Sequence, residues 1–263
     1  MNIKQNKSMS VSKPLLSIVT IHYNDIVGLY LTYQSLFKTI KNKNVEWIII
    51  DGGTDFTAQP IYDSLVSDST VFLSEPDEGI YDAMNKGLAN CNGDYTLFMN
   101  AGDSLLLENI EHDLRKGFDI LAFNSTEGVA IEQGKLKVAR TGRYIWWGMP
   151  THHQALVIKT DKLKCFGFDC SLKVASDYKN LCQLIKEDST YIVINKTLCH
   201  FDTSGFSSNN FILGLVEQQS IRENVLKISP TINFFIKLLK ISVFKTKKLL
   251  PKLYERIRYV SKN

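Results

Sequence analysis

The chain has 263 residues, of which 44% are hydrophobic, and its formal net charge is +4 at pH 7. This length and apolar content predict a single globular α/β domain with appendages. Five cysteines without a Cys-x-x-Cys pair indicate reduced, cytosolic thiols and fit none of the common zinc sites. No apolar run approaches the roughly 20 residues that cross a bilayer, so the sequence predicts no membrane span.

Residues 1–13 are polar and are expected to form a flexible tail, neither a signal peptide nor a membrane span. Beyond them, short apolar runs alternate with amphipathic segments, which predicts strands joined by helices in a mostly parallel sheet. The expected strands cover 15–22, 45–50, 71–73 and 95–99, and the expected helices cover 28–40, 57–66 and 79–89.

Polar residues follow three of these strands. The carboxyl ends of parallel strands lie at the same edge of a sheet, where α/β proteins bind ligands. Tyr23 can stack on a base, Asp51 can accept a hydrogen bond from a base or ribose, and Asn100 can reach ribose hydroxyls. Asp103 is placed to hold Mg²⁺ or Mn²⁺, which takes its other ligands from phosphate oxygens and water. Structural roles are the alternative: Tyr23 can plug the strand end, Asp51 can form a turn and Asp103 can cap a helix.

Four blocks of the chain carry a resemblance to a known family: SIVTIHYN from 17, WIIIDGGTDFT from 47, EPDEGIYDAMNKG from 75 and GDYTLFMNAGD from 93. The sequence resembles the inverting glycosyltransferases of family 2, which have the Rossmann-like GT-A fold. The resemblance implies a catalytic domain at 14–225, with a nucleotide-sugar half at 14–105 and an acceptor half at 106–225. It also implies a divalent cation, and a nucleotide-sugar site that includes Asp82 and Asn85 of the third block.

Two positions depart from the pattern of that family. An Asp-x-Asp motif usually stands where this chain has Asn100-Ala101-Gly102-Asp103, so one expected carboxylate is missing. Gly52 follows Asp51 where many relatives carry a second Asp. The first departure predicts weaker metal binding or more water ligands, and the second weakens the expected contact between Asp51 and the base.

Sugar transfer with inversion requires a general base that takes a proton from the acceptor hydroxyl. The segments HHQALVI from 152 and VASDYKNL from 174 resemble the acceptor half of such enzymes, and Asp177 falls at the position of the base. Helix capping by Asp177 or Ser176 is the alternative. His153 is expected beside the acceptor, or as a hydrogen-bonding residue of the core. His200 is a candidate for completing metal or diphosphate binding.

Residues 226–263 are predicted to form a basic amphipathic helical tail, which from 229 onward has nine Lys or Arg and one acidic residue. Such a helix can lie in the headgroup region of an anionic membrane, or it can pack on the main domain with its lysines in water. Nucleic acid is not expected as a partner, because aromatic and basic residues do not alternate. On a helical projection the apolar side consists of Ile232, Phe235, Ile236, Leu239, Val243, Leu250, Leu253 and Ile257.

By this resemblance the chain is expected to move a sugar from a nucleotide-sugar, such as a UDP-sugar, to a lipid-linked or polysaccharide acceptor. Bacterial surface-polysaccharide synthesis (O-antigen or capsule), on the cytoplasmic face of the cell membrane, is the expected setting. The alternative is a catalytically inactive scaffold of the same fold that binds nucleotide or membrane. A dinucleotide-binding oxidoreductase would require Gly-x-Gly-x-x-Gly after the first strand, where this chain has HYNDIVG from 22.

Overall fold

A computed structural model describes residues 13–53, 70–203 and 210–250 of the chain. The helix expected at 57–66 lies outside the described residues, as does nearly all of the tail expected at 1–13.

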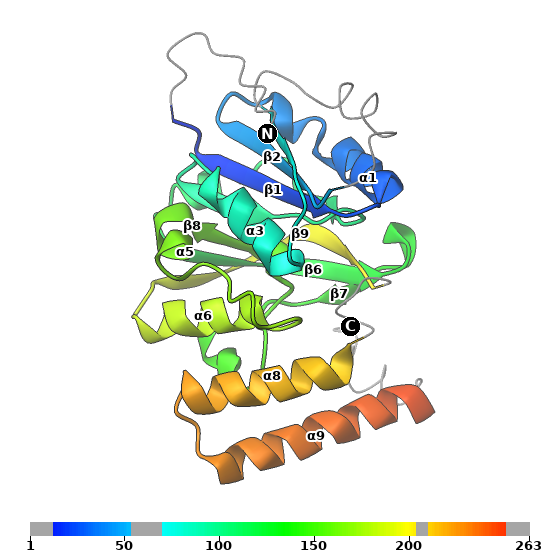
Figure 1. The fold of residues 1–263 in the computed structure, drawn as a ribbon, viewed down its shortest axis with the longest axis vertical. Coiled ribbons are helices and arrows are strands. Elements are labelled where there is room, and N and C mark those ends of the chain that lie inside the picture. Colours follow the sequence, from blue (N-terminus) through cyan, green and yellow to red (C-terminus); the bar gives the residue numbers. More distant parts are fainter. Residues whose placement is uncertain (1–12, 54–69, 204–209, 251–263) are drawn as a thin grey trace.

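The described strands form one sheet, with helices on both of its faces and a pair of helices at one end (Figure 1). The strands are β1 (Leu16–His22), β2 (Val45–Asp51), β3 (Thr70–Ser74), β4 (Tyr95–Phe98), β5 (Ser104–Leu105), β6 (Ile120–Gly128), β7 (Lys135–Lys137), β8 (Leu156–Lys159) and β9 (Tyr191–Asp202). The α-helices are α1 (Ile26–Leu36), α3 (Ile80–Ala89), α4 (Glu111–Leu114), α5 (Thr160–Phe166), α6 (Ser176–Lys186), α8 (Phe211–Asn224) and α9 (Pro230–Leu249). Short 3-10 turns are η1 (Thr39–Lys41), η3 (Ile131–Gln133), η4 (Gly142–Trp146) and η5 (His153–Ala155).

The strands follow the order β3-β2-β1-β4-β8-β6-β9-β5, and β7 pairs with β6. The first four are parallel neighbours, as the alternation of strands and helices predicted. β8 joins antiparallel to both β4 and β6, and β6 and β9 pair in parallel. The carboxyl ends of β1, β2 and β4 therefore lie side by side, and the second half of the chain extends the same sheet.

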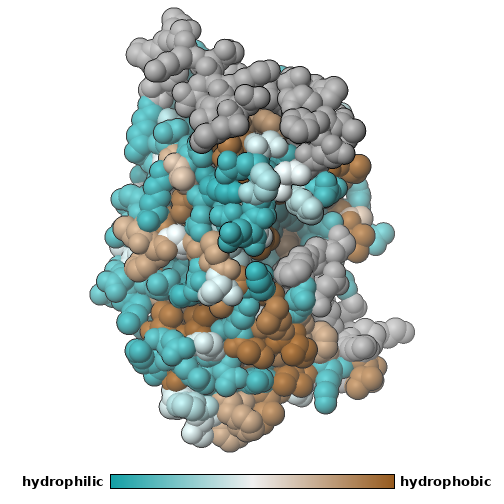
Figure 2. All heavy atoms as spheres, viewed as in Figure 1, coloured by the Kyte–Doolittle hydropathy of each residue, from teal (hydrophilic) through white to brown (hydrophobic). Residues whose placement is uncertain are grey.

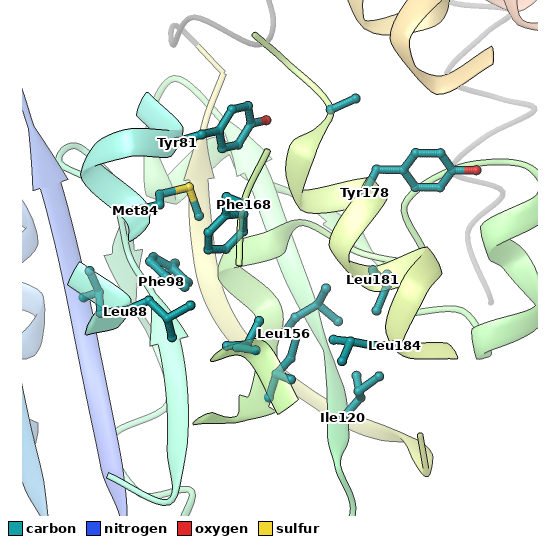
Figure 3. Close-up of a cluster of buried hydrophobic side chains, with 14 of the residues drawn as sticks. Tyr81, Met84, Leu88, Phe98, Ile120, Leu156, Phe168, Tyr178, Leu181 and Leu184 are labelled. Atoms are coloured by element: carbon teal, nitrogen blue, oxygen red, sulfur yellow. The ribbon is translucent and has the colours of Figure 1, made fainter. Parts of the chain in front are cut away.

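Both faces of the first strands are buried because helices cover each of them. β1 and β2 are buried along their whole length, which explains why apolar residues occur on both faces of each strand rather than on alternate positions only. On one face Leu29 of α1 packs with Trp47. On the other face Met84 of α3, Phe98 of β4 and Tyr178 of α6 belong to a second cluster (Figure 3).

Helix α3 lies close against β1 because residue 87 is glycine. A Cβ atom on Gly87 would lie 2.4 Å from Cγ1 of Val19, so any side chain would push the helix away from the sheet. The glycine that ends the EPDEGIYDAMNKG block thus sets how closely the last turn of α3 approaches β1.

The first helix differs from its expected range of 28–40. α1 begins at Ile26 because Asp25 caps it, its Oδ1 accepting a hydrogen bond of 2.8 Å from the backbone N–H of Gly28. It ends at Leu36, and the separate turn η1 follows. The other expected strands and the helix at 79–89 agree with the structure to within one residue at either end.

Helix α9 packs along α8 through buried polar residues and through Phe244, whose ring stacks on that of Phe211, and not through its expected apolar side. Asn233 is fully buried, and its Oδ1 accepts a hydrogen bond of 2.7 Å from Nε of Arg222. Lys240, which lies outside the apolar side of the helical projection, donates from Nζ to Oε1 of Gln218 at 2.6 Å. Burial lowers the pKa of Lys240 to about 7.

The expected apolar side of α9 faces outward as a result. Phe235 is 59% exposed and Leu239 is 56% exposed, and hydrophobic side chains gather at the lower end of the molecule, over α8 and α9 (Figure 2). Within the ranges that the structure describes, every helix is too short or too polar to cross a bilayer.

Candidate functional site

The carboxyl ends of β1 and β2 place Asp51 inside the protein. Asp51 is fully buried, and its Oδ2 accepts a hydrogen bond of 2.7 Å from the Ser74 hydroxyl. Its Oδ1 lies 3.7 Å from Nε2 of His22, whose pKa burial holds below its usual value. The carboxylate expected to contact a base instead joins the ends of three strands.

The open surface beside this strand end belongs to Tyr23 and Asp77. Tyr23 is 65% exposed and borders Gly52. A Cβ atom on Gly52 would lie 2.2 Å from Oδ2 of Asp77, so the Asp77 carboxylate fills the space of the missing side chain. Asp77 is not among the site residues expected from the sequence, although two features point to it: the glycine at position 52 and the acidic character of the EPDEGIYDAMNKG block.

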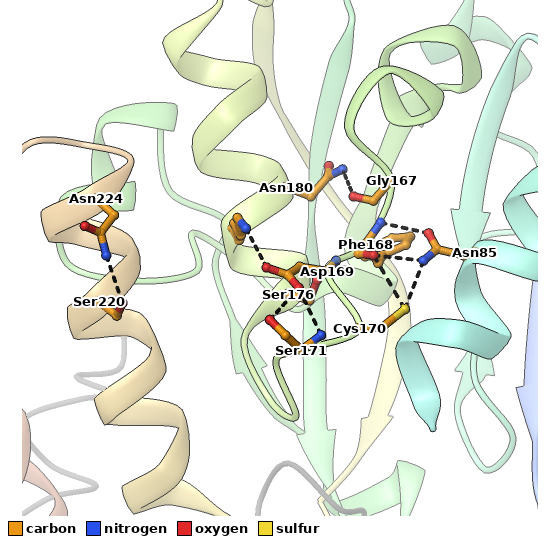
Figure 4. A network of polar contacts seen from close by, with 11 residues as sticks. Asn85, Gly167, Phe168, Asp169, Cys170, Ser171, Ser176, Asn180, Ser220 and Asn224 are labelled. Carbon is orange, nitrogen blue, oxygen red and sulfur yellow. Dashed lines mark hydrogen bonds and ion pairs between the residues drawn. The ribbon is translucent and has the colours of Figure 1, made fainter. Parts of the chain in front are cut away.

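Two residues of α3 expected to bind the donor have partners within the protein. Asp82 accepts a hydrogen bond of 3.1 Å from the backbone N–H of Glu78 and lies 3.1 Å from Nζ of Lys86. The backbone hydrogen bond and the lysine lower the pKa of Asp82. Asn85 donates to the carbonyl of Phe168 and accepts from its N–H, both at 2.8 Å (Figure 4). Asn85 therefore ties α3 to the loop between α5 and α6.

Asn100, His153 and Asp177, which we call the base cluster, join the end of β4 to the start of α6. Nδ2 of Asn100 lies 3.3 Å from Nε2 of His153, and Nδ1 of His153 lies 3.5 Å from Oδ2 of Asp177. The ring of His153 thus separates an expected donor-binding residue from the expected base. Asn100 and Asp177 are 77 residues apart in the sequence, and the fold of the sheet brings them close together.

Asp177 has the environment of a general base. Burial raises its pKa, while His153, the backbone N–H of Tyr178 and the hydroxyl of Tyr81 lower it. A carboxylate whose pKa is raised takes up a proton more readily. Its Oδ1 accepts a hydrogen bond of 2.8 Å from the Tyr178 N–H, and its side chain remains 18% exposed. Tyr81, from the most specific block, was not singled out by the sequence.

The structure places Asp103, the expected metal ligand, inside the protein with hydrogen-bond partners of its own. The residue is only 3% exposed, and its carboxylate accepts hydrogen bonds from Nε2 of Gln154 at 2.7 Å and from the Asp202 N–H at 3.0 Å. Burial raises its pKa to about 7. Over the described ranges, no group of three or more His, Cys, Asp or Glu is arranged to hold a metal ion.

The raised pKa of Asp103 predicts a pH-dependent stability. The folded protein holds a proton that the unfolded chain releases near pH 3.8, so this residue's contribution to stability falls from about pH 4 to pH 7. Each unit of pKa shift is worth about 1.4 kcal/mol. We expect Asp103→Asn, with its amide bonded to a flipped Gln154, to lack this dependence.

Urea unfolding of both proteins in EDTA across that range measures the difference. The free energy of unfolding of Asp103→Asn relative to that of wild type should increase with pH. If the two free energies change with pH in parallel, the carboxyl of Asp103 is not buried in its protonated form.

His200 is separated from the base cluster. It is 2% exposed, and its Nδ1 lies 2.9 Å from the hydroxyl of Thr126 on the neighbouring strand β6. Two residues later on β9, a carboxylate oxygen of Asp202 lies 3.7 Å from the position of a Cβ atom on Gly102. Asp202, rather than His200, therefore approaches the loop where the second acid of the family motif is missing.

The mostly parallel sheet, with polar side chains at its strand ends, defines an α/β fold of the GT-A type. The sequence model of Glycosyl transferase family 2 matches residues 17–171. The chain belongs to this family and is a glycosyltransferase.

Relatives agree with this assignment. An uncharacterized glycosyltransferase of Mycobacterium tuberculosis, MT1564 in strain CDC 1551 and Rv1514c in strain H37Rv, is 28% identical over 209 residues, which cover 75% of this chain and 79% of the relative.

Solved structures share the GT-A fold. S. aureus TarS 1–349 in complex with UDP-GlcNAc has a TM-score of 0.64 at 16% identity, covering 93% of this chain and 78% of TarS 1–349. Mannosyltransferase PcManGT from Pyrobaculum calidifontis in complex with GDP-Man and Mn²⁺ has a TM-score of 0.62 at 12% identity, covering 85% and 69% of the two chains.

Proposed function

We propose that the protein transfers a sugar, with inversion, from a UDP-sugar to a lipid-linked or polysaccharide acceptor in bacterial surface-polysaccharide synthesis. The observation that carries the proposal is the base cluster, in which a partly exposed carboxylate with a raised pKa lies one histidine away from the donor-side strand end. The UDP and UDP-GlcNAc complexes of TarS support the choice of donor nucleotide.

In the proposed reaction Asp177 accepts the proton of the acceptor hydroxyl as the oxygen attacks the anomeric carbon. The bond from that carbon to the donor diphosphate breaks on the opposite face, which inverts the configuration. His153 holds Asp177 toward the end of β4, and Tyr81 contributes a hydroxyl beside the same carboxylate.

Tyr23 and Asp77 are proposed to bind the nucleoside of the donor. The exposed ring offers a surface for base stacking, and the neighbouring carboxylate accepts hydrogen bonds from base or ribose N–H and O–H groups. Asp51 is buried next to this surface and is proposed to stabilise it through its hydrogen bond with Ser74. Asp82 and Asn85 are proposed to act by shaping the start of α3 and the loop that it contacts.

Divalent metal use is general in this family, and Mn²⁺ and Mg²⁺ are the candidates proposed here. When bound, such an ion would offset the negative charge of the leaving diphosphate. Because Asp103 is buried and hydrogen-bonded, no step of the proposed reaction is assigned to a metal. Asp202, at the end of β9, is the carboxylate that approaches the Asn100-to-Asp103 loop.

The donor assignment is tested by incubating the protein with a panel of nucleotide-sugars and measuring hydrolysis and UDP binding, with and without Mn²⁺ or Mg²⁺. We expect UDP-sugars to be hydrolysed slowly, and Asp77→Asn to weaken UDP binding by about tenfold through loss of a charged hydrogen bond.

Glu78→Gln is the matched control, because Glu78 is the exposed neighbour of Asp77. Equal affinity of Asp77→Asn and wild type for UDP would contradict the nucleoside contact. The inactive-scaffold alternative predicts no hydrolysis of any donor.

Helices α8 and α9 are proposed to rest on the anionic cytoplasmic leaflet of the cell membrane. Phe234, Phe235 and Leu239 of α9 and Ile212 of α8 are each more than half exposed. The described length of α9 carries lysines and no acidic residue, which complements an anionic surface. The proposed division into a catalytic domain at 14–225 and a basic tail at 226–263 falls between these two helices.

A further inference from the structure

Helix α8 contacts the loop that leads into the base helix α6 through one buried carboxylate. Oε1 of Glu217 accepts a hydrogen bond of 2.8 Å from the Lys173 N–H, and Oε2 accepts bonds of 2.9 and 2.8 Å from the N–H groups of Val174 and Ala175. Glu217 is only 8% exposed. Three consecutive backbone donors therefore share one carboxylate that lies 42 residues beyond Ala175.

These three N–H groups have no local cap. Ala175 occupies the N-cap position of α6 and makes no side-chain capping bond. The hydroxyl of Ser176 accepts instead from the backbone N–H of Asp169 (Figure 4), and Oδ1 of Asp177 accepts from its own neighbour Tyr178. Neither residue expected to cap the helix holds residues 173–175, so Glu217 performs this function from another helix.

A glycine one turn earlier on α8 allows the approach. A Cβ atom on Gly214 would lie 3.1 Å from Cγ1 of Val174, which is tighter than ordinary packing. Residues 214 and 217 are three apart and so lie on the same side of the helix. The backbone of α8 and the Glu217 carboxylate therefore meet the same short loop.

We propose that Glu217 is a positioning residue for the catalytic base. It holds residues 173–175 and thereby sets where Asp177, two residues further on, lies relative to His153. The proposal rests on the function proposed above for Asp177. Loss of the carboxylate would let the loop move, and displacement of a reacting group by about 1 Å is enough to slow catalysis by about 100-fold.

The test uses the full chain with Glu217→Gln. This substitution keeps the size of the side chain, but its NH₂ group is a donor and cannot accept hydrogen bonds from the backbone N–H groups of residues 173–175. We expect kcat to fall about 10- to 100-fold, the Kd for UDP to stay at its wild-type value, and amide hydrogen exchange to accelerate at residues 173–175. Glu217→Asp, which keeps the charge on a shorter side chain, should recover part of kcat.

Glu223→Gln is the matched control, since Glu223 lies on the same helix and bonds to Asn233 of α9 rather than to the loop. It should leave kcat and the exchange of residues 173–175 unchanged. If Glu217→Gln does not fold, Gly214→Ala crowds the same contact and should lower kcat without changing the Kd for UDP.

Wild-type kcat in Glu217→Gln despite faster exchange would overturn the proposal. So would parallel losses of kcat and UDP affinity, which indicate general destabilisation. Asp177→Asn separates the two proposals: if it retains transfer, the base assignment fails. If it loses transfer while Glu217→Gln keeps it, only the positioning role fails.

Discussion

Asp177→Asn should lower the rate of sugar transfer by about 10²- to 10⁴-fold, the usual contribution of a general base, while UDP binding stays unchanged. The substitution removes the proton acceptor and keeps the shape of the side chain. Its Oδ1 can still accept the hydrogen bond from the Tyr178 N–H, so α6 should keep its start. Transfer assays and UDP titration, carried out on the same preparation, measure the two effects.

The matched control is Glu187→Gln, at the exposed opposite end of α6, which should be fully active. The pH profile of kcat adds a second readout, because burial raises the pKa of Asp177 above its ordinary value of 3.8. Wild-type activity should therefore rise with pH through a pKa above 3.8. Full transfer by Asp177→Asn would show that another group takes the proton.

The double substitution Phe235→Ser and Leu239→Ser should weaken binding to vesicles that contain anionic lipid by about 100-fold or more. Both side chains are more than half exposed on α9, and burying an apolar side chain of this size in the headgroup region gains about 1.5–3 kcal/mol. Because neither side chain fills the core, the folded protein and its affinity for UDP should be unaffected. Vesicle sedimentation measures the binding.

Val129→Ser with Leu136→Ser is the matched control, because these residues are 81% and 49% exposed but lie near β7, away from α9 in sequence. That variant should bind vesicles like the wild type. Vesicles of neutral lipid alone should bind all three proteins weakly, since the lysines of α9 then lack a partner. If the α9 variant and the wild type bind anionic vesicles equally well, the exposed apolar residues of α9 do not bind the membrane.

Strand and helix positions in the first half of the chain could be predicted because the information is local. A largely apolar run such as 45–50, with apolar residues on both faces, is typical of a strand inside a parallel sheet, and β2 is fully buried as expected. The predicted start of α1, at residue 28, was two residues late. Asp25 caps the helix, which therefore begins at Ile26, before the amphipathic pattern becomes clear. The family resemblance supplied the GT-A fold, which the structure confirms.

The departures at Gly52 and Gly102 show what local patterns could not reveal. At each position a carboxylate from a distant segment, Asp77 or Asp202, approaches the space that a side chain would occupy. The sequence marks Gly52, and either Asn100 or Gly102, as lacking an acid that the family pattern contains. Which residue lies there depends on how β3 and β9 are placed in the sheet, and this is a property of long-range packing.

The sequence alone determined the order of the elements in the first hundred residues, the parallel half-sheet, the polar strand ends and the basic composition of the tail, because hydrophobic periodicity and turn residues act over a few neighbours. Only the tertiary structure decided that Asp103 is buried and bonded to Gln154, that His153 meets Asp177, and that α9 packs through Asn233. The physical reason is that a side chain's burial, pKa and partners depend on the segments packed around it, which in this fold come from distant parts of the chain.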